Sequence, residues 1–207
     1  MVGTASEGRM YPASKAREKL ACACVGVAGC GGLGSNAALM LARAGVGRLI
    51  LVDFDRVETS NLDRQYYFAR QVGMRKVEAL AEVIGDTGFS PDLTKHPIRL
   101  DAENVFEIFA EADVILEAFD TVESKAMLLC AFADERFSKT WLVAASGLAG
   151  YGSSNEIKTV QLGEKIYMCG DQRTDGAVEG VLAPRVTMAA AHQANMVVRL
   201  ICGEKAV

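Results

Sequence analysis

Residues 22–34, CACVGVAGCGGLG, decide the fold. The first seven form a short apolar run rich in valine, which predicts a buried strand over 22–28. A glycine-rich turn follows, and residues 33–44 then predict a helix rich in Ala, Leu and Met. This helix should end at Gly45, because glycine is favoured just past the last helical turn. The stretch therefore predicts a strand, a glycine loop and a helix in direct succession.

The same alternation continues outward from this stretch. Strands that alternate with helices of this length form βαβ units with a parallel sheet covered on both faces. Because such crossovers are right-handed, we expect an α/β fold with a Rossmann-like, doubly wound and mostly parallel sheet. The further predicted strands cover 48–53, 93–98, 113–118 and 141–145, and the further helices cover 75–84, 105–110 and 122–134.

The character of the sequence changes after Ser146. Glycines and polar residues surround short β-like stretches at 150–154, 158–162 and 165–169, which predict a C-terminal antiparallel extension. Pro184 then opens a final helix that runs to about Cys202, since proline suits the first helical turn.

The chain shows no internal repeat and no linker, so we predict a single domain over residues 1–207. A length of 207 residues fits one domain with an ample core. Within it we distinguish an N-terminal segment (1–20), a nucleotide-binding core (21–146) and the antiparallel extension with the last helix (147–207).

Composition excludes several classes of protein. The formal net charge of −4 argues against non-specific nucleic-acid binding, which requires a basic face. No apolar run reaches the roughly 18 residues of a membrane span, and the polar N-terminus lacks the apolar stretch of a secretory signal. None of the six cysteines stands in a C-x-x-C pair, so we expect a reducing, cytoplasmic location and no structural zinc.

The glycine loop predicts a nucleotide site. Gly29, Gly31, Gly32 and Gly34 satisfy the pattern G-x-G-x-x-G. Glycine permits a tight turn and a close approach of backbone to phosphate, and the helix N-terminus offers unpaired N–H groups to the anion. Asp53 ends the next strand, where a carboxylate can hold ribose hydroxyls. These residues do not distinguish NAD from ATP.

A polar cluster after the second strand favours ATP. Asn61, Arg64 and Gln65 stand close together and Lys76 follows, whereas a dehydrogenase normally continues into another helix and strand without such a cluster. Arg64 and Lys76 can present two cations to a polyphosphate. Asp120 follows the fourth strand, at the edge where ligands bind in open α/β sheets, and suits Mg²⁺ there.

Each of these residues also has a structural interpretation. Arg64 and Lys76 are then solvated surface charges, and Asn61 stabilises a turn. Asp120 is then the N-cap of the following helix. The functional prediction rests on the combination of these residues and not on any one of them.

This combination resembles the ThiF/MoeB/HesA superfamily, which includes the ubiquitin-activating enzymes. The similarity runs from about Ala23 to Gly203 and is strongest to the short ThiF-type proteins. The matching elements are the G-x-G-G-x-G loop (29–34), D-x-D (53–55), S-N-L-x-R-Q (60–65), G-x-x-K-V-E (73–78), Asp120, and G-V-L-A-P-R-V with a later H-Q-A-N (180–186, 192–195).

The resemblance implies an ATP-dependent adenylyltransferase that acts on the C-terminal glycine carboxylate of a small ubiquitin-fold sulfur carrier ending in Gly-Gly. A ThiS-like carrier of thiamine biosynthesis and a homodimeric enzyme are expected. Arg64, Lys76 and Asp120 would be catalytic, with Asp120 holding Mg²⁺. The residues expected to bind ATP are Gly29, Gly31, Gly32, Gly34, Asp53, Asn61 and Gln65.

Alternatives within the superfamily are a molybdopterin-type carrier and a modified tRNA base. The glycine loop and Asp53 alone would also allow an NAD-dependent oxidoreductase. Some relatives form a covalent intermediate through a cysteine, for which Cys169 is the candidate here. A reactive cysteine needs exposure and a cationic neighbourhood, and Arg173 is close in sequence. Many relatives carry two C-x-x-C zinc pairs that this chain lacks.

Overall fold

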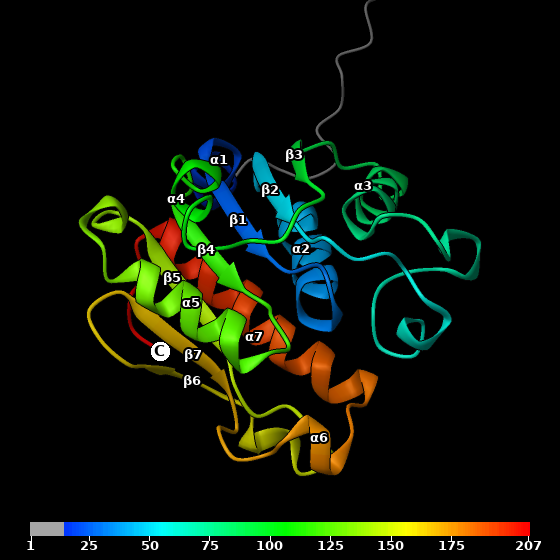
Figure 1. The fold of residues 1–207 in the computed structure, drawn as a ribbon. Helices are drawn as coiled ribbons and strands as arrows, with labels where there is room; N and C mark the ends of the chain where they lie inside the picture. The colour runs from blue at the N-terminus through cyan, green and yellow to red at the C-terminus, as the bar shows by residue number, and fades with distance from the viewer. Residues whose placement is uncertain (1–14) are drawn as a thin grey trace, which may run out of the picture.

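The computed structural model describes residues 15–207, so most of the predicted N-terminal segment lies outside it. Its centre is one seven-stranded sheet (Figure 1). The strands are β1 (Cys24–Ala28), β2 (Arg48–Val52), β3 (Asp92–His96), β4 (Val114–Glu117), β5 (Trp141–Ala145), β6 (Lys158–Gln161) and β7 (Ile166–Gly170).

The sheet has the order β3-β2-β1-β4-β5-β7-β6. Neighbouring strands run parallel except β6, which is antiparallel to β7. The chain builds outward from β1 to β3 and then returns to place β4 on the other side of β1, which is the doubly wound arrangement. The predicted fold class is therefore confirmed, including the antiparallel edge.

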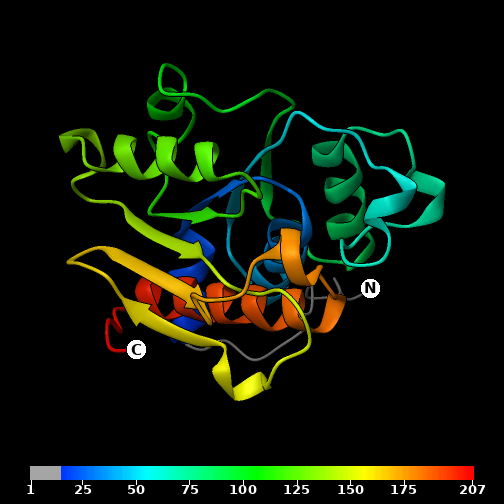
Figure 2. The ribbon, with the colours of Figure 1, turned by 60° about the horizontal axis from the view of Figure 1, so that its bottom comes forward.

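Helices cover both faces of the sheet (Figure 2). Helices α1, α2, α3 and α7 share one apolar core with the sheet, and α4 and α5 share the other. The described helices of four or more residues are α1 (Lys15–Cys22), α2 (Gly32–Ala44), α3 (Lys76–Asp86), α4 (Val105–Ile108), α5 (Val122–Phe132), α6 (Gly176–Glu179) and α7 (Ala183–Cys202).

Two buried faces explain the apolar strands. Side chains alternate along a strand, so Val25 and Val27 enter the core beneath α2 while Cys24 and Ala28 enter the core beneath α5. A strand buried on both faces reads as a continuous apolar run, as β1 does. No helix within residues 15–207 is both long and apolar enough to cross a membrane.

Two parts of the sequence prediction are wrong. Residues 150–154 form a turn that leads into a short 3₁₀ helix, because Gly150 adopts φ +68° and donates its N–H to Gly180 O and not to a strand. Cys22 ends α1 and is exposed, so the strand begins later than predicted, at Cys24.

The start of α2 lies unusually close to the end of β1. A Cβ atom on Gly34 would lie 1.8 Å from Gly29 O, which no side chain can occupy. Gly29 itself has φ +99°, a left-handed conformation that favours glycine. The glycine loop is therefore a steric requirement of this fold as well as a candidate binding element.

Gly34→Ala should destabilise the protein by at least about 3 kcal/mol, because the new Cβ collides with backbone and not with a flexible side chain. Gly85→Ala is the matched control on the exposed side of α3, where a Cβ would meet no atom of residues 15–207 within 4 Å. It should stabilise the protein by roughly 0.5–1 kcal/mol through helix propensity. Denaturant unfolding of both variants measures the difference, and similar free energies of unfolding would contradict the predicted collision.

Candidate nucleotide site at the carboxyl edge of the sheet

The carboxyl ends of β1, β2 and β4 meet at the point where the strand order reverses. The glycine loop follows β1, Asp53 follows β2 and Asp120 follows β4. The loop touches both neighbours, since Gly29 N–H donates to Val52 O at 2.9 Å and a Cβ on Gly29 would lie 2.9 Å from Ala118 O. Ligands of open α/β sheets bind in this position.

The four glycines of the loop differ in their steric surroundings. Gly29 and Gly34 are required by backbone contacts, and a Cβ on Gly32 would lie 3.0 Å from Val186 Cγ1 of α7. At Gly31 the one atom of residues 15–207 that a Cβ would meet is Gln65 Nε2, at 3.8 Å. Gly31 therefore offers the place where a ligand can approach the backbone most closely.

Asp53 braces the glycine loop. Its Oδ2 accepts the Cys30 N–H at 2.7 Å and its Oδ1 accepts the Asp55 N–H at 2.8 Å. Burial raises the pKa of Asp53, and the nearby Lys76 ammonium opposes this shift. Each carboxylate oxygen still has acceptor capacity, so the predicted contact with ribose hydroxyls is chemically open to it.

Lys76 is not a solvated surface charge. It stands at the first position of α3, its side chain is only 8% exposed, and its Nζ lies 2.8 Å from Asp55 Oδ2. A buried ammonium is expensive unless it is paired, and Asp55 is that partner. The pair keeps a cation beside Asp53 and the glycine loop, and it gives Asp55 a structural role.

Arg64, Asn61 and Gln65 lie on a turn that faces the glycine loop. Arg64 Nη1 donates to Ser60 O at 2.8 Å and Asp63 Oδ1 at 2.7 Å, and its side chain remains 29% exposed. Asn61 Oδ1 accepts the Glu58 N–H at 3.0 Å and so caps a 3₁₀ turn.

Gln65 carries an unsatisfied acceptor. Its Oε1 is buried and has no hydrogen-bond partner within residues 15–207, while its Nε2 is the neighbour of Gly31. Buried acceptors of this kind are rare in native proteins and call for an explanation. A donor from a ligand at Gly31, or a bound water, would supply the missing hydrogen bond.

Three side chains that the sequence analysis missed tie this turn to the glycine loop. Ser35 Oγ accepts the Tyr66 N–H at 3.0 Å, and Asn36 Nδ2 donates to Gly32 O at 2.7 Å and Arg64 O at 3.2 Å. Tyr67 donates its hydroxyl proton to Cys30 O at 2.6 Å. The only sequence signal for Ser35 and Asn36 is that they directly follow the last glycine of the loop.

Asp120 is exposed just past β4, and its carboxylate has no hydrogen bond or ion pair within the described part of the chain. It is not the N-cap of α5. That position belongs to Thr121, whose side chain accepts the Ser124 N–H. Within residues 15–207, no three His, Cys, Asp or Glu side chains are grouped to hold a metal. Mg²⁺ often takes one or two carboxylates plus substrate phosphates, and Asp120 fits that mode.

A second unpredicted pair supports the loop that carries Asp120. Glu117 at the end of β4 is 2% exposed and accepts two hydrogen bonds from Lys125 Nζ, at 2.8 and 3.0 Å. Lys125 also donates to Ala145 O at 2.9 Å, and Glu117 accepts the Phe119 N–H at 2.8 Å. The pair therefore joins the ends of β4 and β5 to the first turns of α5.

Cys169 lies in β7 with its side chain fully buried. Burial raises the pKa of Cys169 to about 11, which the 3.5 Å contact with Thr159 Oγ1 only partly opposes. Arg173 does not supply a cation to the thiol, because it pairs with Glu156 at 3.1 Å. The thiol is protonated at neutral pH in this conformation, so a covalent role for Cys169 stays a prediction that requires the sheet edge to open.

A further buried ion pair holds the segment between β5 and α7 in place. Arg185 at the start of α7 pairs with Asp171, and both side chains are almost fully buried. Arg185 Nη1 also donates to Ser153 O at 3.1 Å. These contacts hold residues 147–175 against the beginning of the last helix, beside the glycine loop that Val186 touches.

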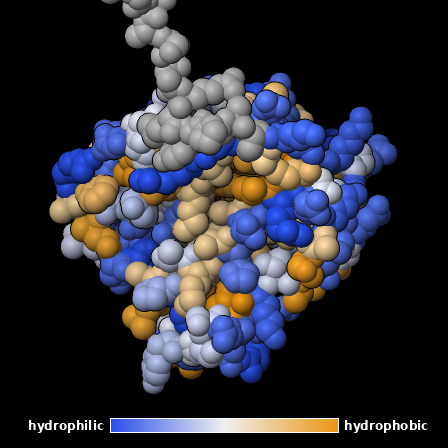
Figure 3. All heavy atoms as spheres, turned by 180° about the vertical axis from the view of Figure 1, so that it is seen from behind, coloured by the Kyte–Doolittle hydropathy of each residue, from blue (hydrophilic) through white to orange (hydrophobic). Residues whose placement is uncertain are grey.

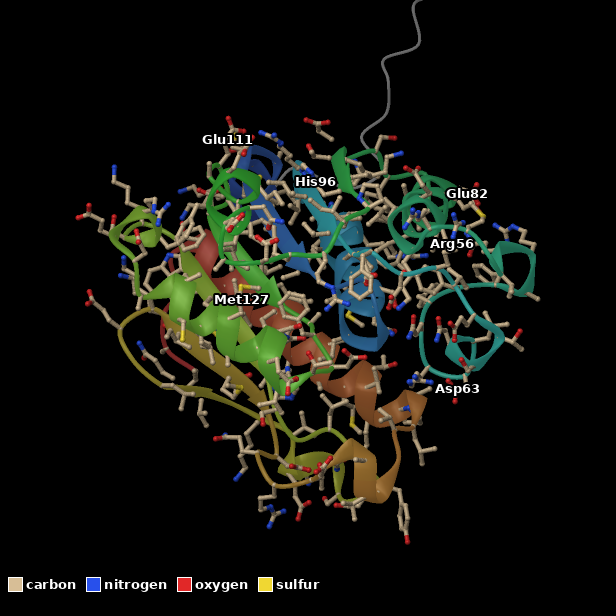
Figure 4. All side chains as sticks on the ribbon, viewed as in Figure 1. Arg56, Asp63, Glu82, His96, Glu111 and Met127 are labelled. Carbon is tan, nitrogen blue, oxygen red and sulfur yellow. The ribbon has the colours of Figure 1, made fainter. Side chains whose placement is uncertain are left out.

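Two residues labelled in Figure 4 help to locate the candidate site relative to the sheet. Asp63, the neighbour of Arg64, and Glu111, which precedes β4, are far apart in this view. Glu111 pairs with Arg48 at the amino end of β2. The polar turn around Asp63 therefore lies away from the amino edge of the sheet, on the side of the glycine loop.

A doubly wound sheet with a glycine loop, a carboxylate and a buried lysine at its switch point is the arrangement found in nucleotide-binding α/β proteins. The chain belongs to the ThiF family, whose family model matches residues 9–207.

Two curated relatives illustrate the similarity. The molybdopterin-synthase adenylyltransferase of Escherichia coli is 32% identical over 186 residues, which cover 86% of this chain and 72% of the relative. The adenylyltransferase and sulfurtransferase UBA4 of Candida glabrata is 36% identical over 144 residues, or 69% of this chain. The match spans only 32% of the length of UBA4.

The fold also matches solved structures. The E. coli tRNA N6-threonylcarbamoyladenosine dehydratase TcdA, in complex with AMP, superposes with a TM-score of 0.82 at 22% identity. The match covers 92% of this chain and 90% of that chain. At this identity the comparison establishes the fold alone.

The burial of Cys169 leads to a labelling prediction. In folded protein at pH 8, iodoacetamide should modify the exposed Cys22 and Cys130 and leave Cys169 and Cys30 unmodified. With a pKa near 11, only about one Cys169 in a thousand is a thiolate at that pH. Peptide mapping by mass spectrometry measures this, with denatured protein as the control. Equal labelling of Cys169 and Cys22 in folded protein would mean that the sheet edge opens.

Proposed function

We propose that the protein is an ATP-dependent adenylyltransferase that activates the C-terminal glycine carboxylate of a small ubiquitin-fold sulfur carrier. The observation that carries this proposal is the buried, Asp55-paired Lys76 beside a glycine loop whose Gly31 is open to a ligand. The names of the E. coli and Candida relatives, both adenylyltransferases, support it. TcdA structures with AMP and with ATP support the choice of nucleotide.

In the proposed reaction, an oxygen of the carrier's terminal carboxylate attacks the α-phosphorus of ATP. The bond from the α-phosphorus to the bridging oxygen breaks, and pyrophosphate leaves with both electrons of that bond. The product is a carrier acyl-adenylate. Little covalent chemistry falls to the protein, so rate enhancement comes from positioning and charge stabilisation.

Each candidate residue has a proposed task in this reaction. Asp53 binds the ribose, and Gly31 lets the phosphates approach the backbone. Arg64 and Lys76 stabilise the charge that develops on the phosphates, and both are held in place before ligand arrives. The other proposed nucleotide contacts are Gly29, Gly32, Gly34, Asn61 and Gln65.

Asp120 is the proposed Mg²⁺ ligand. Its carboxylate is exposed and engaged by no other side chain within residues 15–207, so it is available to a cation. Bound Mg²⁺ would supply neutralisation of phosphate charge. The Glu117–Lys125 pair holds the loop on which Asp120 stands.

The proposed carrier is a ThiS-like protein ending in Gly-Gly, and the proposed pathway is thiamine biosynthesis. A molybdopterin-type carrier and a modified tRNA base are the competing substrates within the family. The acidic composition, with a net charge of −4, gives the chain no overall positive charge to attract tRNA and so favours a protein carrier.

We further propose that residues 1–207 act as one adenylyltransferase unit in a cytoplasmic homodimer. All six cysteines are free, as a reducing compartment would keep them. The face behind the sheet shows an apolar band (Figure 3). The partly exposed apolar side chains of α2 and α7 are Met40, Ala44, Met188, Val198 and Ile201. Sedimentation analysis would test whether two copies of the protein associate.

ATP–pyrophosphate exchange tests the activity. With a ThiS-like carrier ending in Gly-Gly, wild-type protein should exchange label, and Asp120→Ala should lose most of that exchange because the Mg²⁺ ligand is gone. A molybdopterin-type carrier and a threonylcarbamoyl-modified tRNA are tested in parallel. Exchange with either of these alone would reassign the substrate, and binding of NAD without ATP would contradict adenylation.

Arg64→Ala should lower carrier-dependent exchange by on the order of 10²–10³-fold, as expected when a preorganised charge contact is removed. Arg70→Ala is the matched control, because Arg70 is an exposed arginine on the same segment that pairs with Asp86. It should retain near wild-type exchange. Equal activity of the two variants would remove Arg64 from the mechanism.

A further inference from the structure

Tyr67 belongs to none of the nucleotide-binding positions considered so far, yet its hydroxyl reaches into the glycine loop. Its side chain is 5% exposed, and its hydroxyl donates to Cys30 O at 2.6 Å. Lys76 O lies farther away, at 3.4 Å. The hydroxyl has one proton, and the shorter contact to Cys30 is its main hydrogen bond.

The backbone of Cys30 is thereby held from two sides. Its N–H donates to Asp53 Oδ2 at 2.7 Å, and its C=O accepts from Tyr67. Cys30 itself is fully buried. Two side chains from different segments therefore fix the orientation of the peptide units on either side of this residue.

The hydrogen bond to the Cys30 carbonyl determines the direction of the Gly31 N–H. The peptide bond between Cys30 and Gly31 is trans, so its N–H is directed opposite to its C=O. With the carbonyl turned toward Tyr67, the Gly31 N–H is turned away from the protein core. Within residues 15–207 this N–H has no hydrogen-bond acceptor, and Gly31 is only partly buried, with Gln65 Nε2 the one described atom that a Cβ there would meet, at 3.8 Å.

We propose that Tyr67 is a positioning residue that presets the Gly31 N–H to donate to a phosphate of the bound nucleotide. The proposal deepens the proposed function and rests on it. Without the hydroxyl, the Cys30–Gly31 peptide can rotate, and the ligand must then restrain it on binding. Tyr67 thus acts on the phosphate part of the ligand and not on its nucleoside part.

The test separates this role from simple core packing. Tyr67→Phe keeps the buried ring and removes only the hydroxyl. Tyr167→Phe is the matched control, because Tyr167 is fully buried in β7 and donates its hydroxyl to Lys205 O at 2.9 Å, away from the glycine loop. Both variants keep the buried ring and lose one tyrosine hydrogen bond to a backbone carbonyl. The bond of Tyr67 is buried and that of Tyr167 is part-buried, so Tyr167→Phe should lose no more thermal stability than Tyr67→Phe.

Calorimetry would measure the affinity of wild type and both variants for Mg-ATP, AMP and adenosine. Tyr67→Phe should weaken ATP and AMP binding about five- to tenfold, because the ligand must then restrain the freed Cys30–Gly31 peptide, and leave adenosine binding within about twofold. Tyr167→Phe should change none of the three affinities. The amide resonance of Gly31 in a ¹H–¹⁵N spectrum should move in Tyr67→Phe and stay in place in Tyr167→Phe.

Several outcomes would overturn the proposal. Unchanged ATP affinity in Tyr67→Phe would overturn it. An equal loss of affinity for ATP and for adenosine would also overturn it, because that result indicates a general packing effect. Wild-type protein that binds no phosphate-bearing nucleotide would overturn both this inference and the proposed function. Tight ATP binding with the predicted Tyr67 effect but without carrier-dependent exchange would support the inference and overturn the function alone.

Discussion

The site depends on one steric constraint, the close approach of α2 to the end of β1. A Cβ on Gly34 would lie 1.8 Å from Gly29 O, so the helix can begin here only because Gly34 has no side chain. This approach turns the chain sharply and leaves the first N–H groups of the helix at the switch point of the sheet. Unpaired N–H groups at a helix start attract anions, and the packing of the fold therefore creates the element that would bind phosphate.

Charges around this loop are paired before any ligand arrives. Asp53 is engaged by two backbone N–H groups, and Lys76 is buried against Asp55. Such an arrangement costs folding free energy, because burial disfavours the ionised form of Asp53, as its raised pKa indicates. In return the groups would need little reorganisation on binding the proposed phosphate ligand, which is the condition for electrostatic catalysis.

Long-range polar contacts hold the walls of the site. Gln193 of α7 donates its side-chain amide to Glu117 O at 2.7 Å and Val143 O at 3.2 Å, so the last helix is tied to β4 and β5. Arg185, on the same helix, is paired with Asp171. The last helix is thus a support for the site as well as a cover for the sheet, which its apolar packing alone would not reveal.

The sequence by itself determined the alternating elements, the glycine loop and the ends of α2 and α7 at Gly45 and Gly203, because these follow from periodicity and from local backbone conformation. It also predicted that Asp53 and Lys76 lie near the glycine loop, because their motifs are local. Only the tertiary structure decided the contact of Tyr67 with Cys30, the Glu117–Lys125 pair and the burial of Cys169. The physical reason is that these depend on segments far apart in the chain. Tyr67 lies 37 residues from Cys30, and the pairing of β7 with β5 and β6 covers Cys169.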